Sequence, residues 1–251
     1  MIMDNLKLSE FDSISLKDLD KVQLLNRKDT KFVFSQNKLL QLLDRLKPLY
    51  RILEIEGKRT FVYDNTYFDT DEFFFYTQHH NECRKRFKVR YRKYCETNKQ
   101  YFEIKVKDNK NRTIKNRIRS TNRNGDFCEE EKRLISETIG LSPQHLIPKL
   151  DIQFSRITLA DNSFNERLTI DTNLSVKNGI SSKIFDQLAV SEIKQKKYDP
   201  KSDFIQILRD LKIPEMRFSK YCMGMLHVYK EIKYNRFKPK LLRINKILTQ
   251  G

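Results

Sequence analysis

Three consecutive segments of the chain alternate between charged and apolar residues. From Arg86 to Arg92 every even-numbered position is Lys or Arg, and Phe, Val and Tyr stand between them. Charged and apolar residues also alternate over 102–107, with the charged residues at odd-numbered positions, and 114–119 departs from this alternation only at Asn116. The charged positions are Arg86, Lys88, Arg90, Arg92, Glu103, Lys105, Lys107, Lys115, Arg117 and Arg119. Because successive side chains of a β-strand point to opposite faces, the pattern predicts three strands that share one charged and one apolar face.

The charged face of these strands is unusually uniform in sign. A single basic strand is most simply explained as the solvated face of a half-buried sheet. Cross-strand neighbours lie only ~5 Å apart, however, and like charges directly opposite each other destabilise a sheet. Nine cations and one carboxylate on three successive strands therefore indicate a surface that binds an anion.

Later segments add a few acids to this pattern. Asp171 shares a strand face with Arg167, and Glu192 shares one with Lys194. Mg²⁺ or Mn²⁺ typically takes one or two protein carboxylates and completes its coordination with water and phosphate oxygens. A cationic face with isolated carboxylates is therefore typical of a metal–phosphate site. Glu103 is either a second carboxylate of such a site or an ion-pair partner, and the pattern favours neither.

The remaining segments give an α+β pattern. Predicted strands cover 28–34, 50–56, 60–68, 86–94, 100–107, 112–119, 150–159, 167–176 and 188–196. Predicted helices cover 37–47, 71–76, 128–139, 203–211 and 219–230. Ser35 is the expected N-cap of the first helix. Runs of strands with helices at their ends favour an antiparallel sheet.

The charged face must point either to water or into a lumen if the apolar face packs on the helices. Closure around a ligand removes exposed edges and concentrates the field of the charges. We therefore expect an antiparallel β-barrel tunnel of about eight strands with flanking helices. Residues 1–234 are predicted to form a single domain, followed by a basic C-terminal tail over 235–251.

The overall charge agrees with an anionic partner. The 251 residues contain 50 Lys and Arg against 33 Asp and Glu, a formal charge of +17, which suits nucleic acid, anionic lipid or polyphosphorylated molecules. No apolar run reaches the ~20 residues that span a bilayer. We expect a cytoplasmic protein, at most peripheral to a membrane. The tail is either a membrane or partner contact or a solvated tail or peripheral helix.

Several short motifs occur in an order that resembles a known family. They are Arg27-Lys-Asp-Thr-Lys31-Phe, Tyr67-Phe-Asp-Thr70, Arg86-Phe-Lys-Val-Arg90-Tyr-Arg92, Phe102-Glu-Ile-Lys105, Lys115-Asn-Arg117-Ile, Arg156, Arg167-Leu-Thr-Ile-Asp171, Ser191-Glu192-Ile-Lys194 and Phe218-Ser-Lys220-Tyr. Together they resemble the VTC (vacuolar transporter chaperone) domain, or polyphosphate polymerase domain, of the CYTH-like triphosphate tunnel metalloenzymes, in its bacterial form. The first motif lacks the E-x-E-x-K pattern of the adenylate cyclase and thiamine triphosphatase branch, which favours the VTC branch.

The resemblance implies an ATP-binding transferase that moves the γ-phosphate of ATP onto a growing polyphosphate chain. Its expected partners are ATP or another triphosphate, inorganic polyphosphate, Mn²⁺ or Mg²⁺, and a membrane protein for any membrane coupling; no specific nucleic acid is expected. Catalytic roles are assigned to Lys31, Arg90 and Arg92. Substrate-binding roles are assigned to Lys88, Lys105, Lys115, Arg117, Arg156, Arg167, Lys194 and Lys220. Metal-binding roles are assigned to Glu192, Glu103 and Asp171.

Two other functions are compatible with the same residues. One is a triphosphatase that hydrolyses nucleotide or inorganic triphosphate, and the other is a non-catalytic module that binds polyphosphate or nucleic acid. Arg156 is the least regular of the assigned residues, because it has the same parity as Ile152 and Phe154. This parity predicts either a β-bulge that re-aims Arg156 or a position outside the tunnel.

Overall fold

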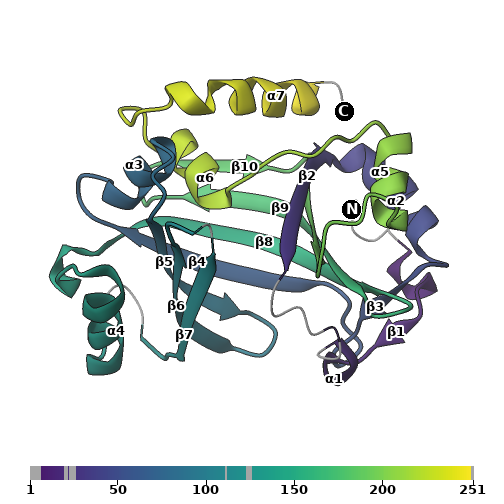
Figure 1. Cartoon of the computed structure of the whole chain (residues 1–251), viewed down its shortest axis with the longest axis horizontal. Coiled ribbons are helices and arrows are strands. Elements are labelled where there is room, and N and C mark those ends of the chain that lie inside the picture. The colour runs from purple at the N-terminus through teal and green to yellow at the C-terminus, as the bar shows by residue number, and fades with distance from the viewer. Residues whose placement is uncertain (1–6, 20–21, 23–26, 111, 123–125, 250–251) are drawn as a thin grey trace.

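One curved antiparallel sheet organises the molecule. The computed structural model describes residues 7–19, 22, 27–110, 112–122 and 126–249 (Figure 1). The sheet order is β2 (Lys28–Ser35), β11 (Leu188–Gln195), β9 (Glu166–Lys177), β8 (Ile147–Asp161), β4 (Phe61–Asp69), β5 (Arg86–Tyr94), β6 (Lys99–Lys107) and β7 (Thr113–Arg119). Strand β10 (Ser182–Phe185) pairs with β9, while β3 (Tyr50–Leu53) pairs with β8 and, in parallel, with β1 (Ser13–Ile14).

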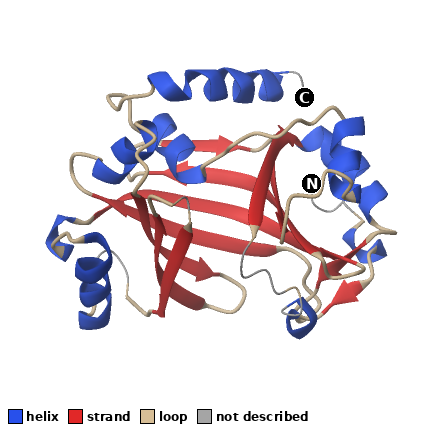
Figure 2. Ribbon diagram, viewed as in Figure 1, coloured by secondary structure: helices blue, strands red, loops and turns tan. Residues whose placement is uncertain are grey.

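The sheet curls around an interior without closing by hydrogen bonds. Strands β2 and β7 end the order and do not pair with each other within the described residues. Figure 2 shows the sheet bending so that β4 to β7 turn toward the viewer beside β2. The predicted α+β class and the antiparallel tunnel of about eight strands are confirmed, whereas the strands that the structure describes do not close the barrel fully.

The outer face of the sheet is apolar and covered by helices. Helices α2 (Leu39–Leu46) and α5 (Asp203–Asp210) bury the side of the sheet formed by β2, β11, β9 and β8. Helices α3 (Phe74–His80) and α4 (Glu129–Ile139) contribute to the core that covers β5 and β6. The apolar residues of the alternating pattern, such as Val89 and Ile104, are fully buried in this core. The Ser35 hydroxyl accepts a hydrogen bond from the Asn37 amide, as expected for the predicted cap.

Helix α6 (Lys220–Val228) packs inside the curl. Its residues share a core with Leu150, Ile152 and Leu174, which lie on the interior face of β8 and β9. The approach is close at Gly224, where an added Cβ would lie 2.8 Å from Leu150 Cδ2. One end of the tunnel is therefore filled by an apolar helix.

The predicted C-terminal tail is a packed helix. Residues Asn235–Phe237 form a 3₁₀ turn and Lys238–Thr249 form α7, whose Ile244 is 1% exposed. Residues 250 and 251 of that tail, like 1–6 of the predicted domain, lie outside the described residues. In the described part of the chain, no helix is both long and apolar enough to cross a membrane. Helix α1 (Leu16–Leu19) lies near β1 (Figure 1).

Candidate functional site: a cationic tunnel

The strand register aligns the basic residues into rows across the interior. Lys88 on β5 lies opposite Lys105 on β6, which lies opposite Lys115 on β7. In the next row Glu103 separates Arg90 from Arg117. The shared charged face predicted for these three strands is therefore confirmed, and it lines the inside of the curl. Three adjacent lysines repel one another unless an anion lies among them.

Glu103 holds the second row together. Its carboxylate lies 2.6 Å from Arg90 and 2.6 Å from Lys115, and 3.9 Å and 3.7 Å from Arg92 and Arg117. Its side chain is 2% exposed. Burial alone would raise its pKa, but the surrounding cations outweigh burial and hold the pKa well below its usual range. Glu103 is therefore an ionised centre for four cations.

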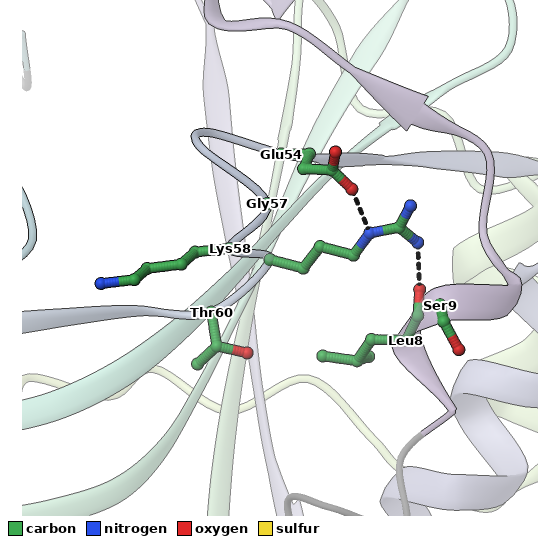
Figure 3. A pocket seen from close by; sticks show the side chains of 7 residues that line it. Leu8, Ser9, Glu54, Gly57, Lys58 and Thr60 are labelled. Carbon is green, nitrogen blue, oxygen red and sulfur yellow. Dashed lines mark hydrogen bonds and ion pairs between the residues drawn. The ribbon is translucent and has the colours of Figure 1, made fainter.

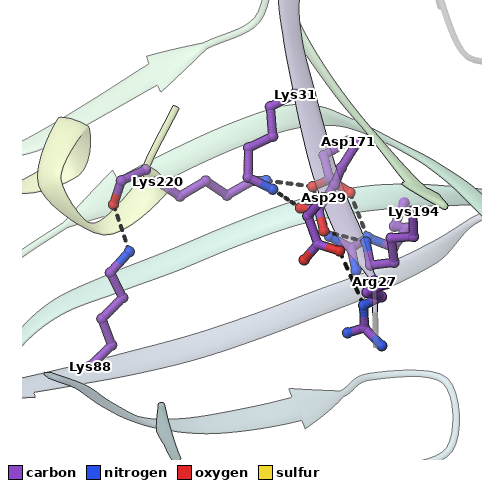
Figure 4. A network of polar contacts seen from close by, with 10 residues as sticks. Arg27, Asp29, Lys31, Lys88, Asp171, Lys194 and Lys220 are labelled. Carbon is purple, nitrogen blue, oxygen red and sulfur yellow. Dashed lines mark hydrogen bonds and ion pairs between the residues drawn. The ribbon is translucent and has the colours of Figure 1, made fainter. Parts of the chain in front are cut away.

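Asp171 forms a second buried centre between β8, β9 and α6. Arg156 donates to both of its oxygens, at 2.6 Å and 2.8 Å, and Lys220 from the first turn of α6 donates to one of them. Despite burial, these cations keep the pKa of Asp171 below its usual range. Figure 4 shows Lys220 and Lys31 reaching toward this centre from different elements.

Glu192 is the most accessible of the three predicted acids. It lies opposite Lys31 in the β11–β2 register and contacts both Lys31 and Lys194, with 19% of its side chain exposed. One carboxylate cannot neutralise two lysines. Burial and then Arg156 lower the pKa of Lys194 to about 7, and burial followed by Lys194 lowers that of Lys31.

Two predicted binding residues keep unused donors. Part of the Lys105 side chain reaches solvent. Partial loss of hydration, followed by repulsion from Lys88, nevertheless lowers the pKa of Lys105 to about 8. Lys105 makes no ion pair within the described residues. The Arg167 Nε atom is buried without a hydrogen-bond partner. Such donors are what an anionic ligand requires.

Arg156 lies inside the tunnel for a reason the sequence did not indicate. It shares its face with Phe154, and its guanidinium lies 5.1 Å from that ring centroid. No bulge in β8 re-aims it; two residues of β9, Asn173 and Leu174, lie opposite Phe154 instead. The apolar residues of this face are interior because α6 covers them. Both alternatives predicted for Arg156 are therefore wrong.

Strand β4 contributes tunnel residues that sequence analysis missed. Tyr67, interpreted above only as part of a motif, accepts a hydrogen bond from Arg90 at 2.7 Å, and Asn65 accepts one from Arg92 at 3.0 Å. Asp29 on β2 lies in the same network as Lys31 and Lys194 (Figure 4). The tunnel residues Asn65 and Tyr67 are uncharged, so β4 lacks the alternating basic residues by which the other tunnel strands were predicted.

The donor set of the tunnel suits a metal only in company with phosphate. Among the residues described, no three His, Cys, Asp or Glu side chains cluster as a metal site. Cations contact all three predicted acids, but Glu192 is 19% exposed, against 2% for Glu103 and 3% for Asp171, which makes it the most accessible predicted ligand. One carboxylate with water and phosphate oxygens is an ordinary environment for Mg²⁺. Glu192 therefore fits a metal that arrives with a phosphate ligand.

A second hollow lies outside the tunnel. Leu8, Ser9, Glu54 and Lys58 are among its lining residues (Figure 3). Arg59 donates to Glu54 at 2.6 Å and to the carbonyl oxygens of Leu8 and Phe11. These bonds tie the N-terminal segment to the β3–β4 connection, which makes the hollow a structural junction.

Comparison with known proteins gives a family and a fold. The VTC domain family model matches residues 26–229. No curated protein sequence matches significantly. A Hippeastrum protein, described as a candidate adenylyl cyclase with a dominant triphosphatase activity, superposes with a TM-score of 0.50 at 14% identity, covering 81% of this chain and 97% of that one. A candidate adenylate cyclase from Bacillus halodurans gives 0.45 at 14% identity, with 85% and 99% covered.

Proposed function

The chain belongs to the VTC domain family of triphosphate tunnel proteins, and on this premise we propose that it is a polyphosphate polymerase. It transfers the terminal phosphoryl group of ATP to a growing inorganic polyphosphate chain. The observation that supports this proposal most strongly is the row formed by Lys88, Lys105 and Lys115 beside the arginines around Glu103. Such a row is stable when a chain of phosphates lies along it.

Two sets of tunnel residues contribute to ligand binding in different ways. Lys88, Lys105 and Arg167 offer donors that no protein acid occupies, so they take the phosphate oxygens. Arg90 and Arg92 are held in place by Tyr67 and Asn65 and present their remaining N–H groups to the same ligand. Prepositioned cations of this kind contribute most to phosphoryl transfer, because the reaction needs alignment and charge neutralisation.

A divalent metal would be held by Glu192 together with phosphate oxygens. When bound, Mn²⁺ or Mg²⁺ would neutralise charge on the phosphates and polarise the bond to the transferred group. Lys31 and Lys194, which contact Glu192, would then turn to the substrate. This role explains why a predicted metal-binding acid is accessible and flanked by lysines.

The transfer itself needs no protein nucleophile. A terminal oxygen of the acceptor chain forms a bond to the γ-phosphorus of ATP, and the bond to the β–γ bridging oxygen breaks. ADP leaves with that oxygen, and the acceptor is longer by one phosphate. Acceptor phosphate oxygens are already ionised near neutral pH, so the residues around them act by orientation and charge.

Product analysis with purified full-length protein tests the proposal. ATP with Mn²⁺ or Mg²⁺ should yield ADP and a ladder of polyphosphate on a gel. Glu192→Gln should abolish the ladder, whereas Glu137→Gln, an exposed acid on α4, should leave it unchanged. If no polyphosphate forms with Mn²⁺ and none forms with Mg²⁺, the proposed polymerase activity is refuted.

A triphosphatase is the second candidate. Lys31 and Glu192 remain 29% and 19% exposed, so water can reach the predicted metal site and act as acceptor. In that case ATP or tripolyphosphate releases inorganic phosphate and no chain grows. The same reaction mixture separates the two activities. Binding of polyphosphate without any turnover would instead identify a silent binding module.

A further inference from the structure

A second basic cavity opens beside the tunnel. It has a volume of ≈ 420 Å³ and lies among the ends of β5, β6 and β7, the segment 217–219 and the start of α7. This volume is within the range of about 300–1,000 Å³ typical of ligand pockets. Its cations are Arg86, Lys88, Lys105, Lys107, Arg217 and Lys240. Among the described residues that line it, Glu82 is the one acid.

The cations of this pocket have no anionic partner in the part of the chain that the structure describes. Within the described residues none of them forms an ion pair, and Glu82 instead faces Arg236 at 3.8 Å. Lys88 donates to the Ser219 hydroxyl at 3.0 Å. Burial, then Arg86 and Arg217, lowers the pKa of Lys107, which indicates that these cations crowd one another. An anion would relieve this repulsion.

The pocket is continuous with the tunnel. Lys88 and Lys105 line both, and the electrostatic neighbours of Lys105 include Asp29 on β2 and Arg90. On β5 the cations Arg92, Arg90, Lys88 and Arg86 follow one another at every second residue. With a rise of ~3.3 Å per residue, this row extends ~20 Å from the tunnel into the pocket.

The pocket also lies where the sheet fails to close. The Met216 amide donates to the Lys31 carbonyl at 2.9 Å, and Glu215 forms an antiparallel β-bridge with Phe32. The segment 215–216 therefore pairs with β2, which β11 also pairs with. The next residues, Arg217 to Ser219, line the pocket together with Thr113 at the start of β7. Phe237 and Lys240 lie beyond the residues that the VTC family model matches.

We infer that this pocket binds the part of an inorganic polyphosphate chain that extends beyond the tunnel, with Arg217 and Lys240 as contacts outside the tunnel. The inference rests on the proposed function. The ligand class follows from continuity with the tunnel: a linear polyanion held at Arg90 reaches Arg86 and Lys107 only by passing through the lysine row. The pocket therefore distinguishes long chains from a triphosphate.

Equilibrium binding of two inorganic probes tests this inference. Full-length protein carrying Arg217→Gln and Lys240→Gln is compared with wild type for tripolyphosphate and for a long-chain polyphosphate. Loss of one exposed charge contact at Arg217 and one half-buried contact at Lys240 should weaken long-chain binding about tenfold and leave tripolyphosphate binding within about twofold. Lys58→Gln with Lys201→Gln removes the same charge at exposed sites elsewhere and should change neither affinity.

Each alternative result has a separate meaning. Equal losses in the pocket and control variants would show a bulk charge effect and overturn the inference. Wild type that binds tripolyphosphate but gains no affinity for the long chain overturns the pocket and leaves the tunnel standing. Wild type that binds neither overturns the proposed function as well. Equal competition by a single-stranded oligonucleotide would identify a general nucleic-acid surface and also overturn the inference.

Discussion

Replacing Glu103 with glutamine removes the carboxylate that four cations surround. Arg90 and Lys115 each lie 2.6 Å from the Glu103 carboxylate, and Arg92 and Arg117 lie within 3.9 Å. Removing one partner of a buried ion pair typically costs about 3–5 kcal/mol. Lys115 and Arg117 are 41% and 37% exposed and regain some hydration, so we expect a loss of about 3 kcal/mol in the free energy of unfolding.

Thermal unfolding of metal-free protein measures this effect. For a chain of this size, about 3 kcal/mol corresponds to a fall in Tm of about 6–12 °C. Added tripolyphosphate should stabilise the Glu103→Gln variant more than wild type, because the ligand supplies the missing negative charge. The Glu129→Gln variant is the control, since Glu129 pairs with Lys132 at 2.7 Å but is 87% exposed.

The outcome separates two roles for Glu103. If the Glu103 carboxylate served only to hold a metal, its replacement would have little effect on the Tm of the metal-free protein. If Glu103→Gln and Glu129→Gln shift Tm equally in the absence of metal and anion, the ion-pair reasoning is refuted. A large shift that tripolyphosphate does not reverse would show that the cluster does not face the ligand.

Three further predictions follow from the interior of the tunnel. The pKa values of Lys194 and Lys105 are lowered to about 7 and about 8, so both side chains lose protons as the pH rises, while bound phosphate favours the protonated forms. The affinity of the metal-free protein for tripolyphosphate, measured by calorimetry, should therefore fall about tenfold between about pH 6.5 and 8.5, and a flat profile would contradict this. Arg167→Gln should weaken tripolyphosphate binding about tenfold without lowering Tm, because the Arg167 Nε has no protein partner; a lower Tm would indicate a structural bond instead. Gly224→Ala should lower the free energy of unfolding by about 1 kcal/mol in denaturant titration, since crowding against Leu150 and Val176 outweighs the gain in helix propensity; a more stable variant would show that α6 can shift.

Local periodicity predicted the strands that line the tunnel, but not all of their neighbours. The alternation from Arg86 to Arg119 identified three strands and their charged face because period-two patterns depend on the strand alone. Which cation lies opposite Glu103 depends on register, which tertiary structure sets. The sequence therefore left open whether Glu103 binds metal or forms ion pairs, and the structure shows ion pairs with four cations.

The misplaced expectation for Arg156 has a similar origin. Apolar residues such as Ile152 normally mark the face turned away from a polar lumen. Here they belong to the interior because α6, more than 60 residues later in the sequence, folds back into the curl. The extra residue of β9 near Asn173, at φ 51°, also shifts the parity of that strand midway. Neither long-range event leaves a mark in a local pattern.

The missing pairing between β2 and β7 in the described part of the chain matters for how a polymer would enter the tunnel. A ring closed by hydrogen bonds admits a long chain only by threading a free end. In this protein the segment Glu215–Met216 pairs with β2, and no β-ladder joins β2 or this segment to β7 within the described residues. Separating these edges would therefore break no β-ladder between them in that part of the chain. A polyphosphate chain bound as proposed above would then be able to enter from the side, by its middle, as well as by one of its ends.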